Sequence, residues 1–367
     1  MFKKIFKKKS FRYSFAPQTK FYDSLSFFLH WKPFLMFSNF PNIRSQYCNT
    51  DSFGLRYNNF NKSGKYQNTD NSILMENVSE EKKNAVIIGS SFAFGFGSTS
   101  DQRTISNYLT KKSMFHFFNL GTIGFSGFQE IIHFLSMLKK LENIKKIIII
   151  SGLNDSFLPY YIKEFDENLG PFFSNSQFLN SMAKKSLNWK TKIIKFVYNN
   201  ILKKKINWNK MYQLHFHKEV LKEKYALSDY KRELDPESSL KFFIDRNLKL
   251  WSVIAKGMDV EIDYVIQPVA VWCQKQLSTE EEKIFKEIDQ SATATNNISK
   301  LIDLKKYNLI RNLIPESCEK YGIGFMDCNE NFRKNNYKYN KEWLFVDRVH
   351  LNDKGYEYVS ESLLSLI

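Results

Sequence analysis

Residues 145 to 155 read "KKIIIISGLND" and contain the clearest strand signal in this chain. Its four consecutive isoleucines are apolar and β-branched, so they predict a strand buried on both faces, as the central strand of a parallel sheet is. Ser151 and Gly152 end the strand, and Asn154 and Asp155 follow directly. Open α/β sheets bind ligands at the carboxyl ends of their strands, so this polar pair predicts a functional edge.

Similar apolar runs lie on both sides of this strand and alternate with segments of helical periodicity. The alternation predicts an α/β fold, a three-layer α/β/α sandwich around a mainly parallel five-stranded sheet. The expected strands are 84–89, 115–121, 145–152, 261–268 and 322–329, and the expected helices are 104–112, 128–141, 240–258 and 353–367.

The composition is that of a globular protein with a large excess of positive charge. Of the 367 residues, 43% are hydrophobic and 16% are aromatic, which is enough apolar material for a sizeable core. The formal net charge of +16 predicts attraction to an anionic partner, such as a lipid surface, a phosphorylated carrier or an acidic glycan. A compositional preference for lysine, with no partner behind it, gives the same charge. No recognised nucleic-acid-binding motif accompanies the lysines, so nucleic acid is disfavoured.

The cysteines and the N-terminal region predict a cytoplasmic protein without a cofactor. The four cysteines form no CxxC pair and no metal-ligand spacing with the histidines, so we expect reduced thiols and no metal. The start, "MFKKIFKKKSFRYSF" (1–15), lacks the apolar run of a secretory signal. The stretch "SLSFFLHWKPFLMF" (24–37) is too short to span a bilayer, which leaves a buried helix or an interfacial segment on an anionic membrane.

We expect the chain to have three parts: an N-terminal extension packed on the core (1–80), the α/β core (81–157 and 240–367) and a basic, aromatic-rich insertion (158–239). Between Asn168 and Lys218 the insertion has no acidic residue, and its lysines are interleaved with aromatic residues. It could cap the active site or present a solvated helical face. His215 and His217 alternate as on a strand, and without a third ligand nearby we expect exposed polar positions.

A serine and an acid–histidine pair are candidates for nucleophilic catalysis. The first strand runs into "GSSFAFGFGS" (89–98), a glycine-containing turn with Ser90 and Ser91 near its apex. The last strand is followed by "VDRVHLNDKGY" (346–356), with Asp347 and His350 three residues apart. A carboxylate at that spacing can orient the imidazole, which can then take the proton of a serine hydroxyl.

Donors for a developing oxyanion are also expected at this edge. The second strand ends in "NLGTIGFSG" (119–127), where Gly124 leaves a backbone N–H uncovered by a side chain, and the third leads to Asn154. A glycine N–H, a helix-opening N–H and an Asn amide are suitable donors. Each block alone has a simpler interpretation, since serine, glycine and asparagine are common in turns and caps. Their coincidence at successive strand ends favours catalysis.

The ordered blocks "GSSFAFG", "NLGTIG", "SGLND" and "DRVHLNDKG" resemble those of the SGNH hydrolases, also called GDSL lipases and esterases. The resemblance implies a flavodoxin-like α/β sandwich. It also implies Ser91 as the nucleophile, Asp347 and His350 as the rest of the triad, and the Ser91 amide, Gly124 and Asn154 as the oxyanion hole. The chain departs from the family's usual Gly-Asp-Ser, because Ser90 stands in the place of the aspartate. A turn with Arg56 resembles an element that precedes the first block in some larger members, and predicts an added strand near the site.

The resemblance implies a serine esterase that cleaves an acyl ester through an acyl-enzyme, with a small O-acyl group on a carbohydrate as the favoured substrate. Two alternatives stay open. The same acyl-enzyme could pass its acyl group to a sugar hydroxyl, which would make the protein an O-acyltransferase of polysaccharide synthesis. A catalytically silent, basic module that binds a glycan or a membrane is the other.

Overall fold

The structure is a computed structural model. It describes residues 10–27, 30–58, 82–141, 143–162, 170–171, 235–290 and 302–367. The chain divides into two compact units, residues 1–162 with 235–367 and residues 163–234. Every helix and strand described below belongs to the first unit. Most of the basic insertion, with His215 and His217, lies outside the described residues, so its role stays a prediction.

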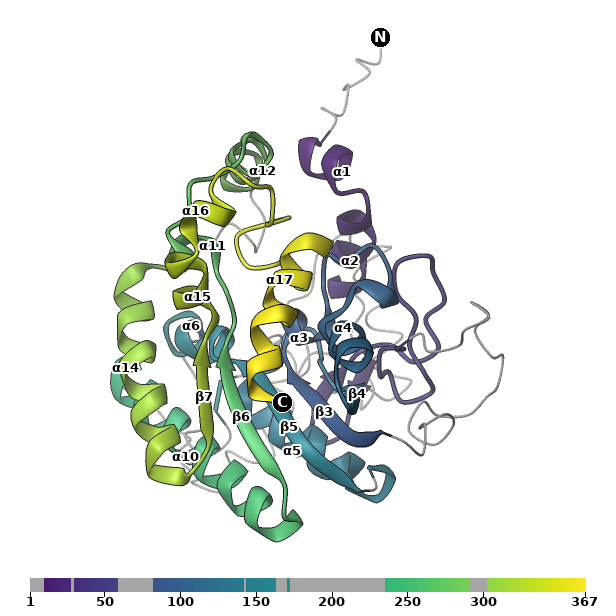
Figure 1. The fold of residues 1–367 in the computed structure, drawn as a ribbon, viewed down its shortest axis with the longest axis vertical. Coiled ribbons are helices and arrows are strands. Elements are labelled where there is room, and N and C mark those ends of the chain that lie inside the picture. The colour runs from purple at the N-terminus through teal and green to yellow at the C-terminus, as the bar shows by residue number, and fades with distance from the viewer. Residues whose placement is uncertain are drawn as a thin grey trace, which may run out of the picture. The chain divides into compact units, whose positions relative to one another are not determined.

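A five-stranded parallel sheet forms the centre of the first unit (Figure 1). Its strands are β3 (Lys83–Gly89), β4 (Phe115–Asn119), β5 (Ile144–Ser151), β6 (Glu261–Ile266) and β7 (Gly324–Asp327), in the order β4-β3-β5-β6-β7. The isoleucines 147–150 of β5 are fully buried. The central position of β5 and all five expected strands are therefore confirmed.

Helices cover both faces of the sheet (Figure 1). Those of the first half of the chain are α3 (Ser91–Phe94), α4 (Ile105–Lys112), α5 (Gly127–Met137) and α6 (Leu153–Tyr161). Those of the second half are α10 (Pro236–Met258), α11 (Ala270–Cys273), α12 (Thr279–Asp289), α14 (Leu304–Tyr321), α15 (Cys328–Lys334), α16 (Asn336–Tyr339) and α17 (Asp353–Leu363). Helix α10 contacts α5, α6 and α14, and these four helices belong to the layer on one face of the sheet (Figure 1). Helix α17 contacts α4, and these two helices belong to the layer on the other face (Figure 1). The predicted three-layer sandwich is confirmed.

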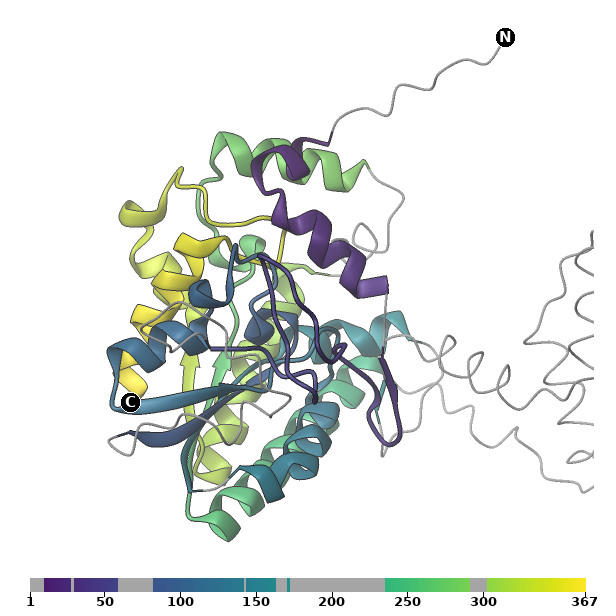
Figure 2. The same cartoon turned by 90° about the vertical axis from the view of Figure 1, so that its right-hand side faces the viewer.

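The N-terminal residues form two helices and a hairpin. Helices α1 (Phe11–Phe15) and α2 (Gln18–Phe27) precede the antiparallel strands β1 (His30–Lys32) and β2 (Met36–Ser38). Figure 2 shows the two helices in purple, with α1 beside α12. The stretch 24–37 is thus part helix and part hairpin, with Leu35 and Phe37 buried while Phe34 at the turn is 90% exposed.

Three details differ from the sequence prediction. Helices α15 and α16 lie between β7 and the loop of Asp347 and His350, so this loop does not follow the last strand directly. Helix α5 ends at Met137 and continues only as a 3₁₀ turn, η2 (Leu138–Lys140), whereas we expected it to reach residue 141. The expected added strand at Arg56 is reduced to isolated bridges, with Asn119 at the end of β4 and with Thr50.

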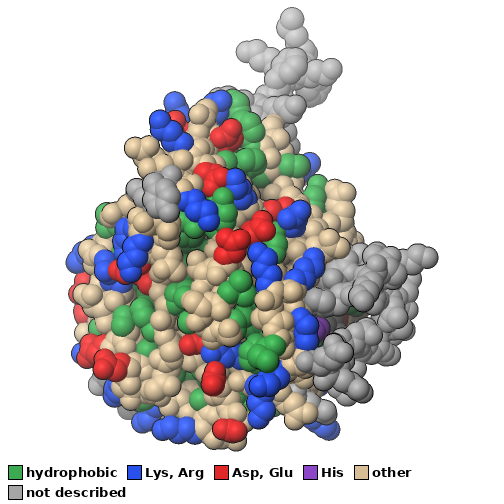
Figure 3. All heavy atoms as spheres, in the orientation of Figure 1, with side chains coloured by type: hydrophobic (Ala, Val, Ile, Leu, Met, Phe, Trp, Pro, Cys, Tyr) green, Lys and Arg blue, Asp and Glu red, His purple; other side chains and the backbone are tan. Residues whose placement is uncertain are grey.

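The described residues bear on the expectations about membrane spans, disulfides and surface charge. Within the stretches that the structure describes, every helix is too short or too polar to cross a membrane. The four cysteines are buried and form no disulfide. On the face shown in Figure 3, basic and acidic side chains are interspersed. The partner of the net positive charge therefore stays a prediction.

Candidate active site

Ser91 is placed by a sharp turn between β3 and α3. A side chain at Gly89 would bring its Cβ to 2.1 Å from the carbonyl oxygen of Ile150, so only glycine lets β3 leave the sheet this close to β5. Ser90 is buried and occupies the N-cap position without a side-chain capping bond. Ser91 is the first residue of α3 and is half-buried, which leaves its hydroxyl at the carboxyl edge of the sheet.

The structure brings Ser91, His350 and Asp347 together in one line of hydrogen bonds. His350 Nε2 lies 2.8 Å from Ser91 Oγ, and His350 Nδ1 lies 2.9 Å from Oδ2 and 3.0 Å from Oδ1 of Asp347. The His350 ring also stacks on Phe96, with centroids 4.2 Å apart and planes inclined by 24°. With its proton on Nδ1, the ring can accept the Ser91 hydroxyl hydrogen at Nε2.

Asp347 is held as a carboxylate inside the protein. It is 2% exposed, and its Oδ1 accepts the backbone N–H groups of Val349 at 2.9 Å and His350 at 2.8 Å. Burial would raise its pKa, but the charge and hydrogen bond of His350 and the charge of Arg12 hold the pKa of Asp347 well below its usual range. The negative charge next to His350 is therefore present at neutral pH.

Gly124 and Asn154, the two remaining oxyanion candidates, lie on segments that are bonded together. Gly124 has a φ of 82°, in the left-handed region that favours glycine. Asn154 is the second residue of α6, and its Nδ2 donates to the carbonyl of Phe125 at 2.6 Å, which leaves its second amide hydrogen for another acceptor. Asp155 Oδ1 accepts the Gly127 N–H at 3.0 Å, so this carboxylate ties the end of the Gly124 loop to α6.

The loop that carries Gly124 packs directly on the nucleophile turn. A Cβ at Gly121 would lie 2.2 Å from the backbone N of Phe94 and 2.5 Å from the backbone carbon of Ala93. The Thr122 N–H donates to the Gly89 carbonyl at 3.0 Å. Because backbone meets backbone at this contact, the position of Gly124 relative to Ser91 depends on it.

Asn39, from the N-terminal region, also holds this loop and was not predicted. Its Nδ2 donates to the Gly121 carbonyl at 2.9 Å, and its Oδ1 accepts the Ile123 N–H at 3.1 Å. One buried amide thus satisfies a donor and an acceptor on either side of Thr122. No local pattern around Asn39 in the sequence indicates a contact with a loop more than eighty residues away.

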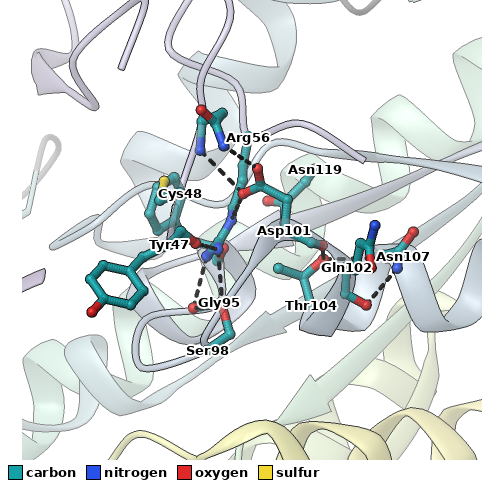
Figure 4. Close-up of polar contacts among 12 residues, drawn as sticks. Tyr47, Cys48, Arg56, Gly95, Ser98, Asp101, Gln102, Thr104, Asn107 and Asn119 are labelled. Atoms are coloured by element: carbon teal, nitrogen blue, oxygen red, sulfur yellow. Dashed lines mark hydrogen bonds and ion pairs between the residues drawn. The ribbon is translucent and has the colours of Figure 1, made fainter. Parts of the chain in front are cut away.

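A buried arginine holds the other end of α3 (Figure 4). Arg56 is 1% exposed and forms an ion pair with Asp101, whose Oδ1 lies 2.9 Å from Arg56 Nε. Its Nη1 donates to the carbonyls of Phe94 at 3.0 Å and Gly95 at 2.8 Å. A cation at the C-terminal end of a helix stabilises the free carbonyls there. Arg56 therefore fixes the turn that follows Ser91, although the sequence indicated only that it lies near the site.

The described residues include no group of three or more His, Cys, Asp or Glu side chains that could hold a metal ion. No family model and no curated protein matches the chain.

Solved structures give several matches. A lipolytic protein of the G-D-S-L family from Veillonella parvula is 11% identical, over 78% of this chain and 98% of its own, with a TM-score of 0.40. LAE5, an α/β hydrolase enzyme from the metagenome of Lake Arreo, is 12% identical over 77% and 94%, with a TM-score of 0.39. Axe2, an acetylxylan esterase from Geobacillus stearothermophilus, is 13% identical over 78% and 95%, with a TM-score of 0.35. Because these similarities are weak, we assign the site from its own geometry, a Ser-His-Asp arrangement at the edge of an α/β sandwich.

Proposed function

We propose that this protein is a serine-dependent ester hydrolase of the SGNH type. The observation that supports it is the line of hydrogen bonds from Asp347 through His350 to Ser91, with 2.8 Å between the imidazole Nε2 and the serine Oγ. A hydroxyl becomes a useful nucleophile when a positioned base takes its proton, and these distances are within reach for that transfer.

In the proposed reaction, Ser91 Oγ attacks the ester carbonyl while His350 Nε2 takes the hydroxyl proton. The Ser91 amide, the Gly124 amide and Asn154 Nδ2 are the proposed donors to the resulting oxyanion. Collapse of the tetrahedral intermediate breaks the bond to the leaving alcohol, which receives the proton from His350. Water then attacks the acyl-enzyme by the same steps and releases the acid.

The proposal also has finer parts, which concern the substrate, the partner and the location. A small O-acyl group on a carbohydrate follows from the resemblance of the sequence blocks, and the net charge of +16 supports an anionic carrier or a peripheral contact with an anionic membrane. We also propose a cytoplasmic location, for which the four free, buried cysteines are the support. Each of these is a hypothesis about the same site or the same surface.

The test is hydrolysis of p-nitrophenyl acetate and butyrate by the purified protein. We expect Ser91→Ala and His350→Ala to lower kcat by several orders of magnitude, up to about a millionfold for a complete triad. Ser90→Ala is the matched control, since it removes a hydroxyl one residue away without breaking the line of hydrogen bonds. It should keep most of the activity.

The outcomes separate the proposal from its alternatives. Wild-type activity that survives in Ser91→Ala would rule out Ser91 as the nucleophile. If the wild type consumes an acyl donor only when a sugar acceptor is present, the protein is an O-acyltransferase. If Ser91 does not react with a fluorophosphonate probe while the protein binds glycan or anionic vesicles, the silent binding module is the correct description.

A further inference from the structure

Arg12, on the short helix α1, reaches Asp347 across 335 positions of sequence. Its Nη2 donates to Asp347 Oδ2 at 3.2 Å, and its Nε donates to the Val346 carbonyl at 3.0 Å. Arg12 is 8% exposed and Asp347 is 2% exposed, so water screens this ion pair much less than a pair on the surface. The guanidinium therefore contacts both the carboxylate behind His350 and the backbone beside it.

The helix that carries Arg12 is fixed to the sandwich. Glu287 of α12 accepts the Phe11 N–H at 2.6 Å and the Arg12 N–H at 3.3 Å, which ties the start of α1 to that helix. Asp23 of α2 accepts from Arg12 Nη1. The guanidinium thus lies between two carboxylates, with its orientation set from both sides.

The loop of Asp347 already supplies enough donors to orient the carboxylate. The N–H groups of Val349 and His350 and the His350 ring all donate to Asp347 Oδ1 or Oδ2. What Arg12 adds to these contacts is a permanent positive charge, because guanidinium stays protonated in proteins. Its distinct effect on Asp347 is therefore electrostatic.

We propose that Arg12 is a positioning residue that weakens the pull of Asp347 on the His350 proton, an inference that rests on the ester hydrolysis proposed above. His350 must be neutral to accept the Ser91 proton. A cation close to Asp347 offsets part of the carboxylate's charge, which disfavours the protonated ring. Arg12 thereby keeps the base available at a lower pH than the Asp347 carboxylate alone would allow.

Other charged or titratable groups lie near Arg12 and Asp347. They are Tyr13 on α1, whose Oη donates to Asp23 Oδ2 at 2.9 Å, Asp23 on α2, Glu287 and Asp289 on α12, Arg348 in the same loop and Tyr356 on α17. Arg348 is paired with Asp289, and Glu287 accepts backbone N–H groups of α1. Burial raises the pKa of Tyr356 well above its usual value, so Tyr356 is neutral. The negative charge of Asp23 offsets part of the positive charge of Arg12. Removing Asp23 should therefore also change the pH at which the His350 ring is protonated.

The test is the pH dependence of kcat and KM for p-nitrophenyl acetate, measured on the full chain. In Arg12→Gln we expect the acid limb of kcat/KM to move to higher pH by about half a unit or more. Arg12→Lys keeps a cation and should stay close to the wild-type limb. Asp23→Asn frees Arg12 from its counter-charge and should move the limb to lower pH. Arg44→Gln is the matched control, because Arg44 is exposed and donates to the carbonyls of Ile43 and Thr50.

An acid limb at the wild-type pH in Arg12→Gln would overturn the proposal, whatever the variant's Tm. If Arg12→Gln does not fold, the proposal is tested with Asp23→Asn alone. An acid limb of kcat/KM that stays at the wild-type pH or moves to higher pH in that variant overturns the proposal. A purely structural role of Arg12 would lower kcat or Tm in these variants without moving the limb in opposite directions.

A direct measurement separates this proposal from the proposed function. The ring proton resonances of His350 can be followed by NMR against pH in the wild type, Arg12→Gln and Asp23→Asn. Opposite displacements of the titration midpoint in the two variants support the role of Arg12 even if no ester is hydrolysed. Equal midpoints in all three proteins overturn it even if the wild type is an active esterase.

Discussion

Glu130 is a carboxyl group enclosed in the core at the carboxyl end of β5. It is 1% exposed, and Ser151 Oγ donates to its Oε1 at 2.8 Å. Burial, with a further contribution from the negative charge of Asp155, raises the pKa of Glu130 well above its usual range. A carboxyl group in this setting favours the protonated form, since no cation is in contact with it among the described residues.

The raised pKa of Glu130 predicts a loss of stability as the pH rises above about 4.5. Because the folded pKa is above the unfolded value, the stabilising effect is complete below about pH 4.5 and is lost as pH rises through the folded pKa. Glu130→Gln keeps an acceptor for Ser151 and cannot ionise, so its Tm should exceed the wild-type Tm by a margin that grows from pH 5 to pH 9. Thermal unfolding across this range, with exposed Glu319→Gln as the control, checks it. A margin independent of pH would show that the pKa of Glu130 is the same in the folded and unfolded states, which would contradict the raised pKa.

At the scale of elements, the strands and the order of their functional ends could be predicted from the sequence. The isoleucines of β5 are buried on both faces, which is the condition under which a continuous apolar run identifies a strand. Parallel strands end at the same edge, so Ser91 after β3 and Asn154 after β5 had to lie near each other. The acid–histidine pair was found from its own spacing, not from its distance to β7.

The parts that could not be predicted are contacts between distant segments. Asn39 reaches Gly121 over 82 positions, and Arg12 reaches Asp347 over 335. Such pairs leave no periodicity in the chain, because each residue is a single polar side chain whose partner is set by tertiary packing. Tertiary packing also explains why α5 ends at Met137 and not at residue 141 as expected. The end of a helix depends on packing as well as on local propensity.

The contact of the Gly121 loop with α3 gives a prediction at this scale. In Gly121→Ala the new Cβ would meet backbone atoms of Phe94 and Ala93, at 2.2 and 2.5 Å, and neither can rotate away. The loop must move, which should destabilise the fold by about 1–3 kcal/mol and lower kcat more than it raises KM. Gly257→Ala in α10 is the matched control, because its Cβ would meet nothing within 4 Å. The free energy of unfolding of that variant, measured in urea, should be about 1 kcal/mol higher than that of the wild type. Equal behaviour of the two variants would contradict the proposed contact.

At the scale of the whole molecule, the described N-terminal residues contact each part of the candidate site. Arg12 binds Asp347, Asn39 binds the loop of Gly124, and Arg56 binds the end of α3 that follows Ser91. These three side chains come from different segments of residues 10–58, and each is at least nine-tenths buried. The geometry of the site therefore depends on residues outside the parallel sheet and its covering helices.

Arg56 tests this dependence, because its guanidinium joins several segments at once. Its Nη2 donates to Tyr22 Oη at 2.9 Å and to the Tyr47 carbonyl at 2.7 Å, while its Nη1 binds the Gly95 carbonyl. Removing one partner of a buried ion pair typically costs about 3–5 kcal/mol, since the other charge stays buried. Arg56→Met should therefore lose about that much stability in urea unfolding, with Asp101 as the charge left behind.

The same variant distinguishes a local from a molecule-wide role. If Arg56 couples the N-terminal residues to the site, backbone hydrogen exchange in Arg56→Met should increase within residues 10–58 and at 94–98, and kcat should fall. Adding Asp101→Asn removes the stranded charge and should recover part of the stability, because the ion pair has no exposed surface on either side chain. It should not recover kcat, since the carbonyls of Phe94 and Gly95 still lack their donor. Full recovery of kcat in the double variant would contradict a role of Arg56 in positioning the turn. It would show that Arg56 is needed only to neutralise the buried charge of Asp101.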